Sequence, residues 1–249
     1  MKKLFPEMTV RLDTGHMICA LAYWLLCFLL FPFFIPILAM GVQRDRTVLS
    51  WVEIVFCAIN GGVMIGVLKE QLSDGVLSIQ VTLKGFRKLF WICLAATGLM
   101  VAYSILIAPL AGFLAGVPMD YSLNFFPITE MAVAVLPGAA VYENPIFATA
   151  VFSALSPFAV CGLFYAPVFG PICCRSRWLG YPAIAVLLAL PAAFTWFWRG
   201  QPEVWIAWYL YQLPVHLLAC WTYQKTDNAW APIISLGMFN LISSLLVLI

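Results

Sequence analysis

Seven long apolar segments constrain the fold of this chain more than any other feature of its sequence. They cover residues 15–40, 51–68, 89–114, 145–168, 178–198, 204–223 and 229–249. Each approaches or exceeds the ~20 apolar residues that an α-helix needs to cross a ~30 Å hydrocarbon core. Because 64% of the residues are hydrophobic and 10% are charged, a soluble domain is excluded. The sequence predicts an all-α fold, a polytopic integral membrane helical bundle of seven to eight transmembrane helices, in one transmembrane domain over residues 1–249.

An eighth segment, residues 128–141, is apolar but shorter and carries Glu130. Its length favours a re-entrant or surface-lying helix over a full span. Lysines and arginines collect on the cytoplasmic side of membrane proteins, so their distribution tests this interpretation. Seven spans with a cytoplasmic N-terminus place ten of these side chains inside and three outside, whereas eight spans give eight against five. We therefore expect seven spans and a short segment that does not cross.

The ends of the apolar segments indicate where the protein resides. The first segment runs from Gly15 to Met40, far longer than the apolar region of a signal peptide, so we expect a retained first span. Many of the ten tryptophans lie at segment ends, as interfacial anchors do. A net charge of +2 gives no indication of a nucleic-acid partner. We expect an integral protein of the bacterial cytoplasmic membrane, in contact with membrane lipids. Residues 70–88 predict a connector at the inner surface.

The eight cysteines fall mostly within apolar segments, without the paired spacing of a zinc site or a disulfide scaffold. Most are expected to pack as small hydrophobic side chains. Cys173 and Cys174 differ because they adjoin two arginines at a predicted membrane surface. Packing and reversible acylation both remain open for this pair.

The segment 166–177, Ala-Pro-Val-Phe-Gly-Pro-Ile-Cys-Cys-Arg-Ser-Arg, is where an apolar run meets these arginines. Pro167 and Pro171 withhold backbone donors and Gly170 relaxes the backbone between them, so a regular helix cannot continue unperturbed. At membrane depth the freed carbonyls must be covered by protein or line a cavity. Any chemistry is therefore expected near this break.

Ionisable side chains within the apolar segments are few, and each is a functional candidate. Glu53 lies at the start of the second segment, Glu130 in the short segment, and His216 in the sixth. Gln212 precedes His216 by one helical turn, so the two can face one polar cavity. A neutral imidazole bonded to a neighbouring helix is the alternative for His216. Glu130 and His216 are the two catalytic candidates.

Motifs with a defined catalytic spacing are absent from the sequence. It contains no His-Glu-x-x-His, no Gly-x-Ser-x-Gly, no phosphate-binding glycine loop and no close pair of carboxylates. With only His16 and His216, a multi-histidine metal site cannot be built. We expect no metal and no cofactor.

The order of features in residues 145–244 resembles the CPBP family, the membrane proteins that include the CAAX prenyl proteases and bacteriocin-processing or immunity proteins. In that family a Pro-containing approach leads to Glu-Glu-x-x-x-Arg, where this chain has Gly170, Pro171 and Arg175. A following span ends in Phe-x-x-x-His, where this chain has Phe194 and Trp198. The resemblance implies a family core over residues 145–249, preceded by N-terminal spans over residues 1–126 that carry no motif.

The third motif of the family pairs a Trp-Ala-Pro-Ile approach with His-x-x-x-Asn. Residues 226–233 match that approach, and Leu236 and Asn240 follow at the motif positions. In active members the resemblance implies a glutamate that activates water, aided by histidines and by an asparagine that stabilises the oxyanion. Here the glutamates and histidines are replaced, and loss of several groups that act as one unit leaves little catalysis.

The preferred hypothesis is therefore a catalytically inactive member that acts as a scaffold or subunit. Its emptied cavity would bind a membrane helix, a lipid or a lipidated peptide, and its partners would be another membrane protein or such a peptide. The alternatives are an active intramembrane endopeptidase with displaced groups, Glu130 as base and His216 as helper, or a subunit of a transport complex.

Overall fold

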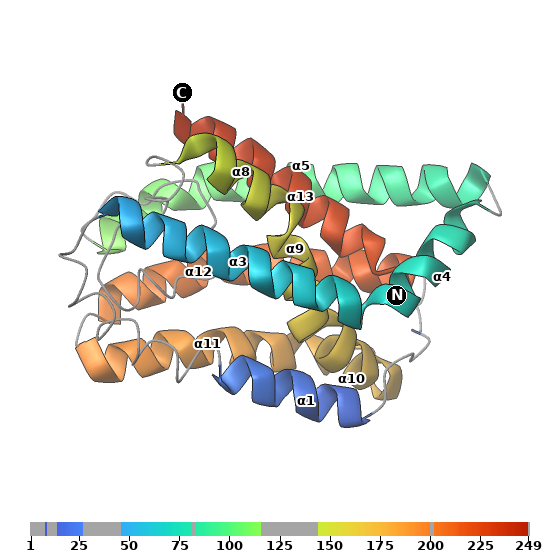
Figure 1. Ribbon diagram of the computed structural model, residues 1–249. Coiled ribbons are helices and arrows are strands. Elements are labelled where there is room, and N and C mark those ends of the chain that lie inside the picture. The colour runs from blue at the N-terminus through green and yellow to red at the C-terminus, as the bar shows by residue number, and fades with distance from the viewer. Residues whose placement is uncertain are drawn as a thin grey trace.

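The computed structural model describes residue 8 and residues 14–26, 46–80, 83–115, 144–199 and 202–248. All regular structure in these ranges is helical, and no strand occurs in them. Most helices lie side by side along one common direction, as a bundle (Figure 1). This confirms the predicted all-α fold for the described part of the chain.

The helices follow the predicted apolar segments closely. In chain order they are α1 (Thr14–Leu25), α3 (Arg46–Val67), α4 (Lys69–Gln80), α5 (Leu83–Ala115), α8 (Pro145–Ala154), α9 (Ser156–Val160), η2 (Cys161–Phe169), α10 (Gly170–Arg175), α11 (Gly180–Arg199), α12 (Pro202–Thr226) and α13 (Trp230–Leu248). Helix α3 begins five residues before its predicted start and α5 six residues before, because a hydropathy pattern does not register the polar first turns of a helix. The short segment with Glu130 lies outside the described residues.

Two helices in the described ranges are long and apolar enough to cross a membrane, Gly85–Ile107 and Pro145–Arg175. A third candidate is the pair Ile54–Val67 and Lys69–Ser78, which is bent by 67° and forms either a broken span or a re-entrant loop. Gly180–Leu190 and Trp230–Leu246 are apolar but shorter. The described helices thus give two to three candidate spans and support membrane association.

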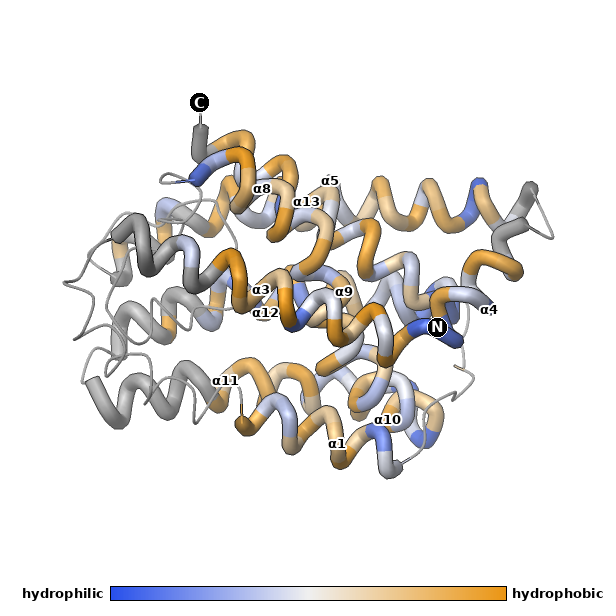
Figure 2. Tube along the Cα trace, in the orientation of Figure 1, coloured by the Kyte–Doolittle hydropathy of each residue, from blue (hydrophilic) through white to orange (hydrophobic). Residues whose placement is uncertain are grey.

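One end of the bundle carries most of the described cations. Figure 2 shows hydrophilic residues gathered where α4, α10 and the first turns of α5 lie. The helix ends there contribute Lys69, Arg87, Lys88, Arg175, Arg177 and Lys225, together with the acids Glu70, Asp74 and Asp227. We call this the basic end. Arg46 and Arg199 belong to helix ends on the opposite side of the bundle.

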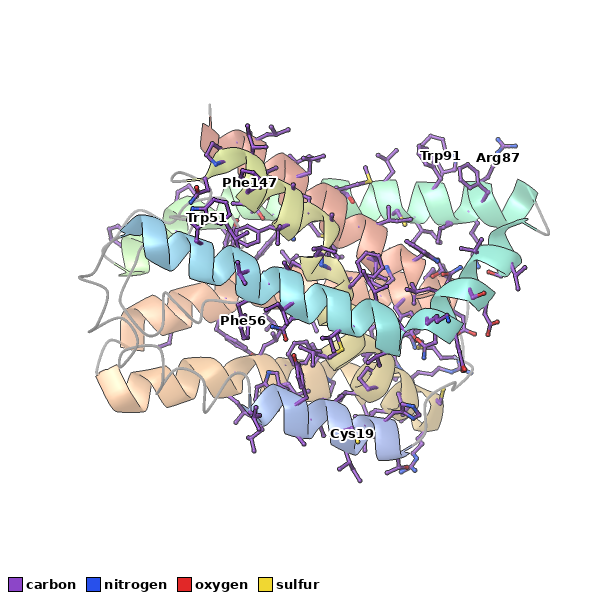
Figure 3. The ribbon with its side chains drawn as sticks, viewed as in Figure 1. Cys19, Trp51, Phe56, Arg87, Trp91 and Phe147 are labelled. Carbon is purple, nitrogen blue, oxygen red and sulfur yellow. The ribbon has the colours of Figure 1, made fainter. Side chains whose placement is uncertain are left out.

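Helix α5 extends past the rest of the bundle at the basic end (Figure 1). Its 33 residues measure about 50 Å, which exceeds the ~30 Å of a hydrocarbon core. Phe86, Phe90 and Trp91 are exposed on its first turns, and Arg87 and Trp91 point away from the bundle (Figure 3). Aromatic and basic side chains together are typical of a membrane interface.

The α12–α13 turn is tied to α4 through Asn228. Its side-chain amide donates to the Gly75 carbonyl at 3.1 Å and to the Ser78 hydroxyl at 3.2 Å. Its amide oxygen accepts the backbone N–H of Trp230 at 2.9 Å, which caps the start of α13. Asn228 thus contacts the predicted connector over residues 70–88. This connector is mostly helical, because it comprises most of α4 and the start of α5.

Candidate functional site

The centre of the bundle is η2, a π-helix in which all nine residues are buried. Pro167 lies inside it, and the Gly170 N–H closes it on the Tyr165 carbonyl. A proline ring clashes with the carbonyl four residues earlier, and a wider π turn relieves that clash. The predicted perturbation at the Pro/Gly break is thus present. The expectation that the span ends at Val168 was wrong, because the π turn lets the helix run on to Arg175.

Side chains donate to backbone carbonyls near two other prolines in the helices. Pro214 in α12 cannot donate to the Leu210 carbonyl, and the Tyr103 hydroxyl donates to that oxygen instead. Pro157 stands at the interruption between α8 and α9, where the Asn240 side chain donates to the Phe152 carbonyl at 2.8 Å. Both contacts give a backbone carbonyl at or beside a helix interruption a side-chain donor, as broken helices in a membrane require.

His216 lies in the core of the bundle and is 1% exposed. The Tyr165 hydroxyl and His216 Nδ1 are 2.6 Å apart, so α12 is joined to η2 by a hydrogen bond. The hydroxyl donates when the imidazole carries its proton on Nε2, since Nδ1 then accepts. Gln212, one turn earlier, is 2% exposed and its Oε1 has no hydrogen-bond partner. The predicted alternative of an imidazole bonded to a neighbouring helix is therefore observed.

The motif positions at the N-terminal side of α10 are buried or half-buried. A Cβ placed on Gly170 would lie 3.6 Å from the Tyr165 carbonyl oxygen and 3.7 Å from the ring of Tyr223, at ordinary contact distances. Pro171 is half-buried, and Arg175 is exposed at the basic end. Position 170 thus lacks a carboxylate, but a methyl group on Gly170 would fit without a close contact.

The remaining motif positions lie on α11 and α13. Leu236 is 3% exposed in the hydrophobic core, and Asn240 holds the Phe152 carbonyl. Phe194 and Trp198 belong to α11, and their side chains lie outside the described set. His216 and Asn240 therefore bond to different helices, and no group of three His, Cys, Asp or Glu side chains that could hold a metal occurs among the described residues.

Packing accounts for the cysteine pair. Cys173 is 1% exposed and donates to the Arg177 carbonyl at 3.6 Å. Cys174 is half-buried, and its thiol donates to the Met8 carbonyl at 2.8 Å. This agrees with the packing interpretation of the two thiols.

A groove of about 460 Å³ lies between α1 and α3 and is also lined by residues of η2. Its lining is mostly apolar, and it comprises Gly15, His16, Cys19, Ala20 and Tyr23 from α1, Val63, Met64 and Val67 from α3, and Gly162 and Pro167 from η2. Such a volume is within the ~300–1,000 Å³ of small-molecule sites. Cys19, labelled in Figure 3, is exposed on α1.

Helix α1 is joined to the bundle by two side chains near its C-terminal end. The Tyr23 hydroxyl donates to Asn60 Oδ1 at 2.8 Å, which joins α1 to α3. Trp24, 3% exposed, meets Phe164 of η2 edge to face at 6.3 Å between ring centroids. The turns from Gly15 to Cys19 are largely exposed. Tyr23 thus lines the groove where α1 is joined to α3, and the lining residues of the first turns of α1 are exposed.

The sequence hypotheses did not identify this groove. A signal was present, because the five α1 residues that line it are spaced i, i+1, i+4, i+5 and i+8, along one helical face, and three of them are small. What could not be deduced from the sequence is that α3 and η2 lie opposite that face.

Comparison with known proteins gives no match. No family model, no curated protein and no solved structure matches the chain.

Proposed function

We propose that this chain is a catalytically inactive membrane protein, similar in fold to the CPBP family, that acts as a scaffold or subunit by binding an apolar chain. The bound hydrocarbon chain would be part of a lipid or a lipidated peptide, and it would lie in the groove between α1 and α3. The groove itself is the observation that carries the proposal, since about 460 Å³ of mostly apolar lining suits such a ligand. Its wall of small α1 residues, Gly15, Cys19 and Ala20, leaves space that larger side chains would fill.

The absence of catalysis in this proposal rests on the motif positions. Gly170, Pro171 and Leu236 cannot take up a proton, and loss of a general base alone costs about 100- to 10,000-fold in rate. Asn240 is engaged with the Phe152 carbonyl.

Seven spans with a cytoplasmic N-terminus, in a bacterial cytoplasmic membrane, form part of the proposal. The concentration of cations at the basic end supports it, because lysines and arginines favour the cytoplasmic side. Helix α5 ends and α8 begins on the same side of the bundle (Figure 1), so the segment that joins them need not cross the membrane.

A photocrosslinking experiment tests the binding function. Purified protein in phosphatidylcholine vesicles is irradiated with a phosphatidylcholine that carries a diazirine on one acyl chain, and labelled residues are mapped by mass spectrometry. Label is expected on groove residues, and Val63→Trp is expected to remove it by filling the groove. Ile59→Trp is the matched control, because Ile59 is exposed on the same helix, as Val63 is, but does not line the groove. Groove label that survives Val63→Trp would contradict the proposal.

Cleavage of a farnesylated peptide in the same vesicles tests for the enzyme alternative. The proposal expects no cleavage by the wild type. Cleavage that Glu130→Gln abolishes would establish the endopeptidase instead.

A further inference from the structure

The groove has a direction relative to the basic end, and this direction indicates which lipid it takes. We propose that it selects an anionic phospholipid of the surrounding bilayer, with one acyl chain between α1 and α3 and the phosphate at the basic end. This inference rests on the proposed function and adds the chemistry of the ligand's headgroup.

The groove runs from the basic end toward the middle of the bundle. At one end it is lined by His16 at the start of α1 and by Val67, the last residue of α3. At the other end Tyr23 is bonded to Asn60, which lies about two turns before the end of α3. The end of α3 and the start of α4 lie at the basic end (Figure 1). A chain that enters there points its tail at Tyr23 and leaves its headgroup among the charged residues.

Two exposed cations follow groove-lining residues along the chain toward the basic end. Lys69 follows the groove residue Val67 by two positions and is exposed. Arg175 ends α10, which continues the η2 wall of the groove, and it too is exposed. The acid Glu70 directly follows Lys69 in the first turn of α4, and Asp74 lies one turn later. The elements that line the opening are thus each followed by an exposed cation, Lys69 after α3 and Arg175 at the end of α10. An anionic headgroup at the opening is expected to interact with these two side chains.

A bilayer lipid satisfies both halves of this site. The mostly apolar wall gains nothing from a free phosphate ion, since burial of apolar surface is what stabilises a chain there. A lysine or arginine at the membrane surface favours anionic lipids by about 1 kcal/mol, which corresponds to about fivefold in relative occupancy. The preference for an anionic over a zwitterionic lipid is expected to fall by about that factor when one cation is removed.

The test compares two diazirine lipids that differ only in their headgroup, phosphatidylglycerol and phosphatidylcholine, at equal amounts in vesicles that contain the full chain. Phosphatidylglycerol is expected to label the groove more strongly, and Lys69→Gln is expected to lower the ratio of the two labels about fivefold. Lys88→Gln is the matched control, because Lys88 is exposed at the same end on α5, which does not line the groove.

Equal labelling by the two lipids would overturn the inference and leave the proposed function standing. The same holds if Lys69→Gln and Lys88→Gln change the ratio equally, which would indicate a general surface charge effect. Absence of groove label from both lipids would overturn the proposed function as well.

Discussion

The side-chain amide of Asn240 donates a 2.8 Å hydrogen bond to the backbone carbonyl of Phe152. Phe152 lies three residues before the Leu155 interruption between α8 and α9, and Pro157 follows that interruption without a donor of its own. In a membrane no water would replace a missing partner. Asn240 thus joins α13 to α8 close to the point where the helix between α8 and α9 is interrupted.

Replacement of Asn240 by leucine keeps the size of the side chain and removes the donor. We expect Asn240→Leu to lower the free energy of unfolding by about 1–2 kcal/mol, since a buried carbonyl loses its partner. Unfolding of the purified protein in detergent micelles measures this loss. Leu241→Ala is the control, because Leu241 is 44% exposed on the same helix and should change stability less. Equal losses would contradict the role given to Asn240.

The Tyr165–His216 hydrogen bond can be measured by a double-mutant cycle. Tyr165→Phe and His216→Phe each remove one partner, and the double variant removes both. We expect a coupling energy of about 0.5–1.5 kcal/mol, the size found for hydrogen bonds between transmembrane helices. Additive losses would mean that the 2.6 Å contact contributes no net stability.

Two adjacent glycines in α3 should respond oppositely to alanine. A Cβ on Gly61 would lie 2.6 Å from the Leu155 carbonyl oxygen, whereas a Cβ on Gly62 would meet nothing within 4 Å. We expect Gly61→Ala to destabilise the protein by about 1–3 kcal/mol, because backbone must move. Gly62→Ala should be neutral or stabilising by up to about 1 kcal/mol, because alanine is the better helix former. Unfolding in detergent ranks the pair, and an equal response would contradict the close approach of α3 to α9.

The sequence predicted the helices well because a ~20-residue apolar run has few other structures available. It also identified the Pro/Gly break and placed His216 in the interior. It did not predict that the break would be absorbed as a π turn, since this depends on the helices that enclose η2. The termination expected at Val168 was wrong for that reason.

The groove could not be predicted from the sequence, because it too depends on how the helices pack. The small face of α1 is visible in the residues Gly15, Cys19 and Ala20, but a face becomes a groove only when other helices stand opposite. The resemblance to the CPBP family directed attention to Gly170 and Leu236, which are buried.

The number of spans depends on whether the end of α5 and the start of α8 lie on the same side of the membrane. Helix α5 ends at Ala115 and α8 is capped at Asn144, and both ends lie on the same side of the bundle (Figure 1). In Ala115→Cys and Asn144→Cys variants, a membrane-impermeant maleimide is expected to label both introduced thiols from outside intact cells. Arg175→Cys should react only in inside-out vesicles, and the unsubstituted chain gives the background of the native cysteines. Labelling of Ala115→Cys and Asn144→Cys from opposite sides would mean that the segment with Glu130 crosses the membrane, which would make eight spans and reverse the side of every later helix end.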